Sequence, residues 1–197
     1  FLTDRLIDDG IKAAEFTGSA ASAVPVKDTV KQVDDNRIVA ATLPPLGICY
    51  IAAVLERAGH SVRIIDGVAE KTTKEELREE ILEFKPDIVG ITALTVSYNR
   101  AIETAKFIKN IDKNIILVLG GPHVSSIPVK TFQENDNFDI GVVGEGETTF
   151  PELVKYLEKT ATDYKAGLEN INGLVFKKNN GEIVLTPGRA LIENLDT

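Results

Sequence analysis

Apolar residues recur at helical spacing, three and four positions apart, in several stretches after residue 44. The clearest helix start is Thr73-x-x-Glu76, a pattern in which the two side chains satisfy free amides of the first turn. An apolar stripe of Leu77, Ile81 and Leu82 follows it, and prolines and glycines mark the expected ends. The pattern predicts helices over 46–58, 73–85, 101–108 and 150–159, with a short helix around residue 132.

Short apolar runs rich in β-branched residues alternate with these helices. They begin about 26 residues apart, which is the size of a βα unit. Near-continuous apolar strands are typical of a parallel sheet that helices cover on both faces. Right-handed crossovers then give an α/β fold with a doubly wound, Rossmann- or flavodoxin-like open parallel sheet of about five strands. The clearest strands are SVRIID (61–66), DIVGIT (87–92), NIILVL (114–119) and DIGVV (139–143).

The two ends of the chain depart from this alternation. Residues 174–177 and 182–185 flank Asn180-Gly181, which predicts a C-terminal β-hairpin at the sheet edge or against a further domain. A first, central strand is needed before the helix at 46. The candidates are Arg37–Ala41, which we favour, residues 23–26, or a segment upstream of Phe1. We divide the chain into an N-terminal extension (1–36), a Rossmann-like domain (37–168), and a hairpin with linker (169–197).

Composition narrows the possible partners of the 197 residues. The formal net charge is −8, whereas nucleic-acid binding needs a basic patch, so we expect no nucleic-acid partner. No apolar run approaches the roughly 20 residues that span a membrane, so no membrane partner is expected. The single cysteine, Cys49, forms no internal disulfide, which indicates a reducing cytoplasm. One cysteine also cannot hold an iron–sulfur cluster, which takes about four thiolates, and we interpret Cys49 as a small buried hydrophobe.

Ligands of open parallel sheets bind beyond the carboxyl ends of the strands, so the residues there carry the candidate chemistry. Gly120-Gly121 and Gly144-x-Gly146 follow two consecutive predicted strands and remove side chains there. Two such tips side by side predict a groove for a long, flat or rod-like ligand. We expect a large side chain at Gly121 to fill this groove and leave the fold intact. The hydroxyls available to a ligand's amides or phosphodiester are those of Thr92, Thr95, Ser97 and Ser125.

Other doubly wound families lack their signatures in this chain. There is no Gly-Lys-Ser/Thr of a phosphate-binding loop, and Gly144-x-Gly146 has no third glycine for a dinucleotide fingerprint. A self-contained nucleotide- or sugar-nucleotide-binding enzyme stays open, with Glu145, Glu147 and His123 as acid/base candidates. The same glutamates also suit the dipole at the start of a helix. A non-catalytic interaction domain with empty tips is the third possibility.

At these tips the sequence resembles the cobalamin-binding domain that precedes the catalytic domain in radical S-adenosylmethionine (SAM) enzymes. That family includes cobalamin-dependent methyltransferases and the anaerobic magnesium-protoporphyrin monomethyl ester cyclase. The likeness covers about residues 44–197 and depends on the order and spacing of several stretches. These are residues 44–66, ILVLGGPHVSS (116–126), PDIVGITALTVSYNRAIETAKFIK (86–109), DIGVVGEGETTFPELV (139–154), and a tail from 170 that resembles the connector to the radical domain.

The resemblance implies cobalamin as the cofactor and assigns positions around it. Thr92 to Thr95 match the element that lines the nucleotide tail, Gly120-Gly121 lie beside that tail, and the loop from Gly144 to Thr149 lies near the benzimidazole. Pro45, Leu46 and Gly47 match the loop near the corrin face. The full set of expected cofactor-binding residues is Pro45, Leu46, Gly47, Thr92, Leu94, Thr95, Ser97, Gly120, Gly121, Pro122, His123, Gly144, Glu145, Gly146 and Thr148.

One departure concerns cobalt. The mutase branch of cobalamin proteins carries Asp-x-His-x-x-Gly, whose histidine binds the metal, and this chain has no such motif. We therefore expect base-off cobalamin without a protein histidine on cobalt, with His123 near the corrin or its amides and His60 at a helix end. The resemblance places SAM and the [4Fe-4S] cluster in a downstream radical SAM domain, which becomes the expected partner. It assigns no catalytic residue and no metal ligand to this chain, which we do not expect to be catalytic by itself.

Overall fold

A five-stranded mixed sheet forms the centre of the protein. The computed structural model describes residues 30–34, 37–42, 46–67, 72–160 and 164–190. The strand order is β3-β4-β5-β6-β7, in which β3, β4 and β5 are parallel and β6 and β7 add antiparallel at one edge. This confirms the α/β class and the hairpin at the sheet edge, although three strands rather than five are parallel. The strands are β3 (Ile88–Thr92), β4 (Ile116–Gly120), β5 (Ile140–Val142), β6 (Leu174–Lys177) and β7 (Ile183–Leu185).

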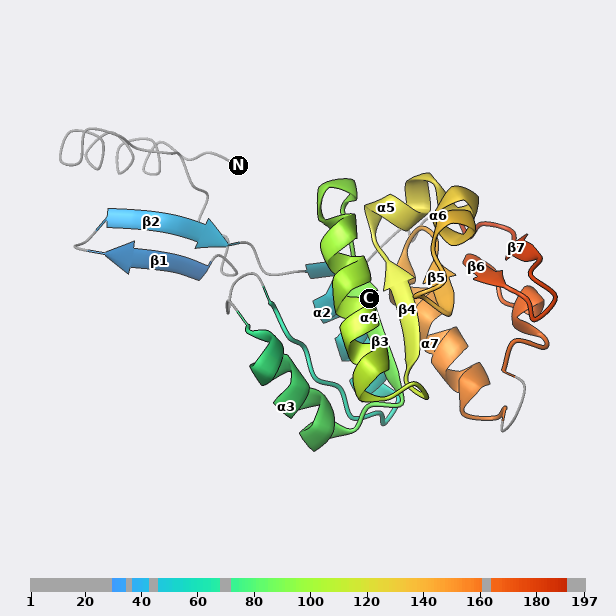
Figure 1. The fold of residues 1–197 in the computed structure, drawn as a ribbon, viewed down its shortest axis with the longest axis horizontal. Helices are drawn as coiled ribbons and strands as arrows, with labels where there is room; N and C mark the ends of the chain where they lie inside the picture. The colour runs from blue at the N-terminus through green and yellow to red at the C-terminus, as the bar shows by residue number, and fades with distance from the viewer. Residues whose placement is uncertain (1–29, 35–36, 43–45, 68–71, 161–163, 191–197) are drawn as a thin grey trace.

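Helices lie on both sides of this sheet (Figure 1). The side chains of β4 alternate between the two faces, as a strand requires. Leu117 and Leu119 pack into a core with α3 and α4, whereas Val118 packs with residues of β5, α7 and β6. The helices are α2 (Leu46–Arg57), α3 (Lys74–Phe84), α4 (Tyr98–Ile111), α5 (Pro122–Ser126), α6 (Pro128–Glu134) and α7 (Gly146–Leu157), with the 3₁₀ turns η1 (Thr95–Ser97) and η2 (Leu168–Asn170).

The start of α3 is the capping box that its sequence predicts. The Glu76 amide donates to Thr73 Oγ1 at 3.2 Å, and the Thr73 amide donates to Glu76 Oε2 at 2.7 Å. These hydrogen bonds lower the pKa of Glu76, the backbone bond most. The expected stripe is only partly right, because Ile81 is buried but Leu82 is 51% exposed.

Two predicted strands do not join the main sheet. Residues 61–66 form no strand, and Arg63 instead pairs with Glu80 and lies over the Phe84 ring, which holds this segment against α3. Residues 37–42 do form a strand, β2 (Arg37–Thr42), but it pairs antiparallel with β1 (Val30–Asp34) in a separate two-stranded sheet. The prediction of a central strand at Arg37–Ala41 is therefore wrong, and β3 is an edge strand. The alternative at 23–26 lies outside the described residues.

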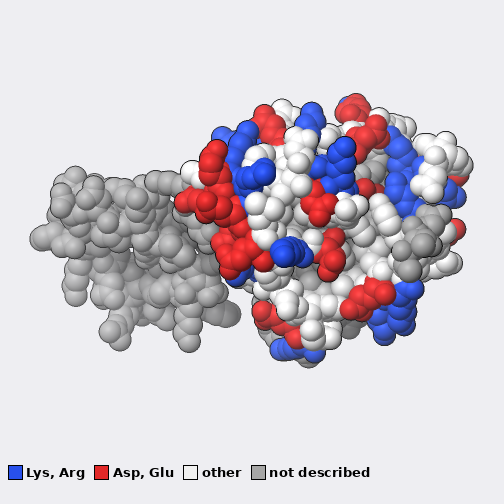
Figure 2. Space-filling model, turned by 60° about the horizontal axis from the view of Figure 1, so that its bottom comes forward, with Lys and Arg blue, Asp and Glu red and all other residues white. Residues whose placement is uncertain are grey.

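The surface carries mixed charge on the face drawn in Figure 2, where acidic and basic side chains are interspersed. Helix α3 contributes acidic groups to the surface through its sequence KEELREEILEF. Within the described segments, no helix is long and apolar enough to cross a bilayer.

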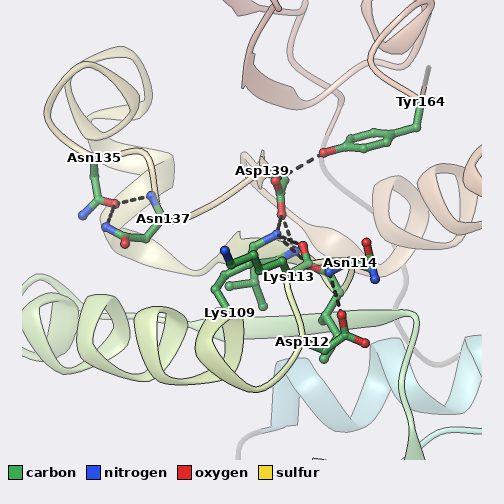
Figure 3. Close-up of polar contacts among 10 residues, drawn as sticks. Lys109, Asp112, Lys113, Asn114, Asn135, Asn137, Asp139 and Tyr164 are labelled. Atoms are coloured by element: carbon green, nitrogen blue, oxygen red, sulfur yellow. Dashed lines mark hydrogen bonds and ion pairs between the residues drawn. The ribbon is translucent and has the colours of Figure 1, made fainter. Parts of the chain in front are cut away.

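A polar network joins α4, β4 and β5 at the amino ends of the parallel strands (Figure 3). Asp139 Oδ2 accepts from the Leu117 amide at 2.8 Å and lies 2.8 Å from Lys109 Nζ. Lys109 also donates to the Ile115 carbonyl at 2.7 Å, and the Tyr164 hydroxyl donates to Asp139 Oδ1 at 3.2 Å. One partly buried carboxylate therefore fixes the starts of two neighbouring strands to a helix end.

Replacing Asp139 by alanine should destabilise the fold, because the Leu117 amide and the Lys109 ammonium would both lose a partly buried partner. We expect the free energy of unfolding in urea to fall by about 1–3 kcal/mol. Asp136→Ala is the control, since Asp136 is 81% exposed and pairs with Lys177 at the surface. That change should cost less than about 1 kcal/mol. Equal losses for the two variants would contradict the role given to Asp139.

Candidate functional site

The carboxyl ends of the parallel strands β3, β4 and β5 lie at the same end of the sheet, near α5 in Figure 1. The register pairs Thr92 with Gly120, the last residues of β3 and β4. Beyond them, the Ala93 amide donates to the Gly120 carbonyl and the His123 amide to the Ala93 carbonyl, both at 3.0 Å. We call this end of the strands the rim; it consists of three tips, the first (92–97) after β3, the second (120–125) after β4 and the third (144–149) after β5. The structure thus brings together the tips that the sequence predicts to be neighbours.

The two glycines after β4 differ in what surrounds them. Gly121 has φ 93° and ψ −178°, a region that only glycine occupies readily. A Cβ there would lie 2.5 Å from Thr92 Oγ1 and 2.9 Å from the Ala93 carbonyl oxygen. At Gly120, a Cβ would have nothing within 4 Å. The expectation that a large residue at Gly121 leaves the fold intact is therefore wrong, and Gly120 is the position that opens onto free space.

Gly121→Ala should lower the melting temperature, because alanine would adopt a strained backbone conformation and press on Thr92. The expected cost is about 1–3 kcal/mol. Gly120→Ala, one residue earlier on the same tip, should leave the melting temperature nearly unchanged. Thermal unfolding followed by circular dichroism compares the two variants. A larger fall in melting temperature for Gly120→Ala would contradict the close packing assigned to Gly121.

Ser125 connects the second tip to the third. Its hydroxyl donates to the Gly121 carbonyl at 3.0 Å and accepts from the Gly144 amide at 2.9 Å. Gly144 has φ 81°, and the space where its Cβ would lie is open. The sequence suggests Ser125 as a hydroxyl for a ligand, but in the structure its hydrogen bonds join two loops of the protein.

His123 connects the second tip to the first and is turned inward. The side chain is 5% exposed, Nδ1 lies 3.3 Å from Thr95 Oγ1, and the ring stacks on Tyr98 with 3.8 Å between centroids. Burial lowers the pKa of His123, so the neutral imidazole is favoured. Its ring lines a pocket of about 300 Å³ between α4, α5 and α6, together with Tyr98, Ile102, Lys130, Thr131 and Glu134 among others.

Acidification should destabilise the protein through His123. Because the folded pKa lies below the unfolded value of about 6.5, the unfolded chain takes up the proton first as the pH falls. Stability from this group is therefore complete above about pH 6.5 and declines below it. Tyr98, Lys130 and Glu134 line the same pocket and are present in both His123→Gln and the unmodified chain. Urea unfolding at pH 7.5 and 5.5 should show a smaller pH dependence for His123→Gln than for the unmodified chain, and an identical dependence would contradict this assignment.

The turn after β3 presents apolar side chains to solvent. Ser97 Oγ accepts from the Leu94 amide and donates to the Leu94 carbonyl, both at 3.1 Å, so this predicted ligand hydroxyl caps its own turn. The turn leaves Leu94 55% and Val96 92% exposed. Leu94 is among the predicted site residues, whereas Val96 is not. Its signal is an apolar residue between two hydroxyl residues at a strand end.

The third tip leads into α7. Gly146 is a packing position, since a Cβ there would lie 2.7 Å from Ile51 Cδ1 of α2. Glu147 carries a buried Oε2 atom that has no hydrogen-bond partner within the described residues. Glu145 interacts with other residues of the protein, and Thr148 is exposed. Of the predicted corrin loop, Leu46 is exposed, a Cβ at Gly47 would meet open space, and Pro45 lies outside the described residues.

Arg189 fixes the first turn of α7 from far along the sequence. Its Nε donates to Thr149 Oγ1 at 2.9 Å and to the Asn172 carbonyl at 3.2 Å, and the guanidinium pairs with Glu152. Thr149 is fully buried. Arg189 has no predicted site role, because no local sequence pattern connects positions so far apart. Within the described residues, no group of three His, Cys, Asp or Glu side chains is placed to hold a metal ion.

Comparison with known proteins assigns this fold and rim to a family. The family model of the B12 binding domain matches residues 36–154, which includes all three tips. The chain belongs to the B12-binding domain family. This confirms the resemblance drawn from the tips. The matched range begins just before β2, so the family pattern includes that strand.

The relatives of this B12-binding domain are longer proteins. An uncharacterized methyltransferase of Pyrococcus horikoshii is 45% identical over 82% of this chain and 34% of its own length. An anaerobic magnesium-protoporphyrin IX monomethyl ester cyclase of Rubrivivax gelatinosus is 31% identical over 80% of this chain and 28% of its own. The chain thus spans about a third or less of these relatives. The cobalamin-dependent SAM radical enzyme OxsB, solved with aqua-cobalamin bound, shares the fold with a TM-score of 0.64 at 22% identity over 75% of this chain and 20% of OxsB.

Proposed function

We propose that this B12-binding domain binds cobalamin at the rim, with the nucleotide tail of the cofactor between the second and third tips. The observation that carries the proposal is the open space beside Gly120 and Gly144, on two loops that Ser125 holds together. A cobalamin tail is long and has few charges, so it needs room and hydrogen-bonding groups rather than cations. The rim offers both.

The chain's own residues suit the chemistry of the cofactor. Exposed Leu94 and Val96 provide apolar contact for the corrin edge or the benzimidazole, and Thr92 and Thr95 provide hydroxyls. Leu46 and Gly47 at the start of α2 complete the proposed corrin side. Bound cobalt would supply the methyl-transfer or electron chemistry, while the protein positions the cofactor.

We further infer that the cofactor binds base-off, without a protein histidine on cobalt. The chain has no Asp-x-His-x-x-Gly motif, and the ring of His123 is buried against Tyr98 and Thr95. His60 lies beside Glu158, at the other end of α2 from Leu46 and Gly47. Neither histidine is therefore placed to bind cobalt. The visible spectrum of the bound cofactor distinguishes the base-off state.

The whole protein is proposed to be a cobalamin-dependent radical SAM enzyme of the methyltransferase or cyclase type, acting in the cytoplasm. The relatives' names and the additional length of their chains support the enzyme class. Residues 37–168 would then be the cofactor module, and residues 169–197 would lead to a radical SAM domain that holds SAM and the [4Fe-4S] cluster. A self-contained nucleotide or sugar-nucleotide enzyme is less well supported, because His123, one of its acid/base candidates, is 5% exposed.

The test is hydroxocobalamin binding by the chain and by two leucine variants. The unmodified chain should retain the cofactor through desalting, with an altered visible spectrum. Gly120→Leu should weaken binding at least about tenfold, or about 1.4 kcal/mol, because the side chain would occupy the proposed groove. Its melting temperature should stay near that of the unmodified chain. Lys113→Leu is the control. Lys113 is exposed and precedes β4, so the substitution introduces the same leucine side chain at the other end of that strand.

Lys113→Leu should bind cobalamin like the unmodified chain. Loss of the cofactor from the unmodified chain would overturn cobalamin binding itself. Undiminished binding by Gly120→Leu would instead show that the tail does not run beside Gly120.

A further inference from the structure

Ser125 lies in the five-residue helix α5, between the two glycine tips of the rim. Both hydrogen-bond partners of its hydroxyl are backbone groups of these tips, the Gly121 carbonyl at 3.0 Å and the Gly144 amide at 2.9 Å. A serine hydroxyl has a single hydrogen to donate. That hydrogen is used on Gly121, so Ser125 has none left for a ligand.

We propose that Ser125 is a positioning residue, which sets the spacing between the Gly121 and Gly144 tips and thereby the width of the cofactor groove. This inference rests on the proposed function, because it concerns the same groove. It replaces the expectation that Ser125 contacts the cofactor directly.

The need for such a residue follows from the glycines themselves. Gly121 and Gly144 both have positive φ, and glycine has more backbone freedom to lose than any other residue. On one side, the Val143 amide donates to the Gly173 carbonyl at 2.8 Å, next to the end of β5. On the other side, Ser125 holds the Gly144 amide. Without that hydroxyl, the third tip would lose its hydrogen bond to the second tip.

The chain contains a matched control in the next residue. Ser126 lies in the same helix, and its hydroxyl donates to the Pro122 carbonyl at 2.7 Å, the same four-residue spacing as the bond from Ser125 to Gly121. Ser126 is exposed, and this bond stays within α5. Ser125→Ala and Ser126→Ala therefore both remove a hydrogen bond to the residue four positions earlier, but only Ser125→Ala removes the connection to Gly144.

The experiment measures hydroxocobalamin affinity for the unmodified chain, Ser125→Ala, Ser126→Ala and Ser125→Thr. Ser125→Ala should bind roughly tenfold more weakly, which corresponds to about 1.4 kcal/mol. Ser126→Ala should bind like the unmodified chain, and Ser125→Thr, which keeps the hydroxyl, should recover most of the affinity. In the cofactor-free protein, the Gly144 amide should exchange its hydrogen faster in Ser125→Ala than in Ser126→Ala.

Each outcome has a separate meaning. If the unmodified chain does not bind hydroxocobalamin, the proposed function fails. If it binds and Ser125→Ala binds equally well, the positioning role is overturned. The same holds if the two alanine variants lose affinity equally and in proportion to their melting temperatures, because Ser125 would then contribute only to general stability.

Discussion

The rim depends on the connection of three strand ends through one short helix. The His123 amide binds the Ala93 carbonyl after β3, and the Ser125 hydroxyl binds the Gly144 amide after β5, while α5 itself follows β4 directly. Gly121 permits this by taking a backbone conformation in which its missing Cβ leaves room for Thr92. Loops with few side chains would otherwise lack contacts to fix them. The rim has few side chains, and hydrogen bonds of the backbone together with His123 and Ser125 of α5 hold its loops in place.

The two ends of the parallel strands have different chemistry. At the amino ends of the strands, Asp139 and Lys109 satisfy each other and neighbouring backbone groups in a charged network. At the carboxyl ends, the rim carries hydroxyls, glycines and exposed apolar side chains, with one buried carboxylate oxygen left without a partner in the described structure. The network of Asp139 and Lys109 therefore lies at the end of the strands away from the rim, and the ion pair of Arg189 with Glu152, next to the rim, stays within the protein. This division leaves the rim available for a large, weakly charged ligand.

Local sequence patterns predict the parts of this structure that local forces determine. The capping box at Thr73, the helices α2 and α4, and the strands β3 to β5 follow from hydrophobic spacing and turn residues. Residues 61–66 have the composition of a strand, but contacts of Arg63 with α3 hold them elsewhere. Strand β2 is present, yet its partner depends on long-range pairing that a strand pattern does not specify. The difference between Gly120 and Gly121, and the contact of Arg189 with Thr149, likewise depend on tertiary structure.

Cobalamin binding at the rim is tested most directly by mapping the ligand onto the backbone of the protein. A nuclear magnetic resonance titration of the ¹⁵N-labelled chain with hydroxocobalamin reports every amide that the cofactor perturbs. We expect the largest shifts at the amides of Gly120, Gly121, Gly144 and Thr95, with small shifts at Lys113 and Asp139 near the amino ends of the strands. Saturable binding with its largest shifts away from the rim, or no shifts at all, would contradict cobalamin binding at the rim.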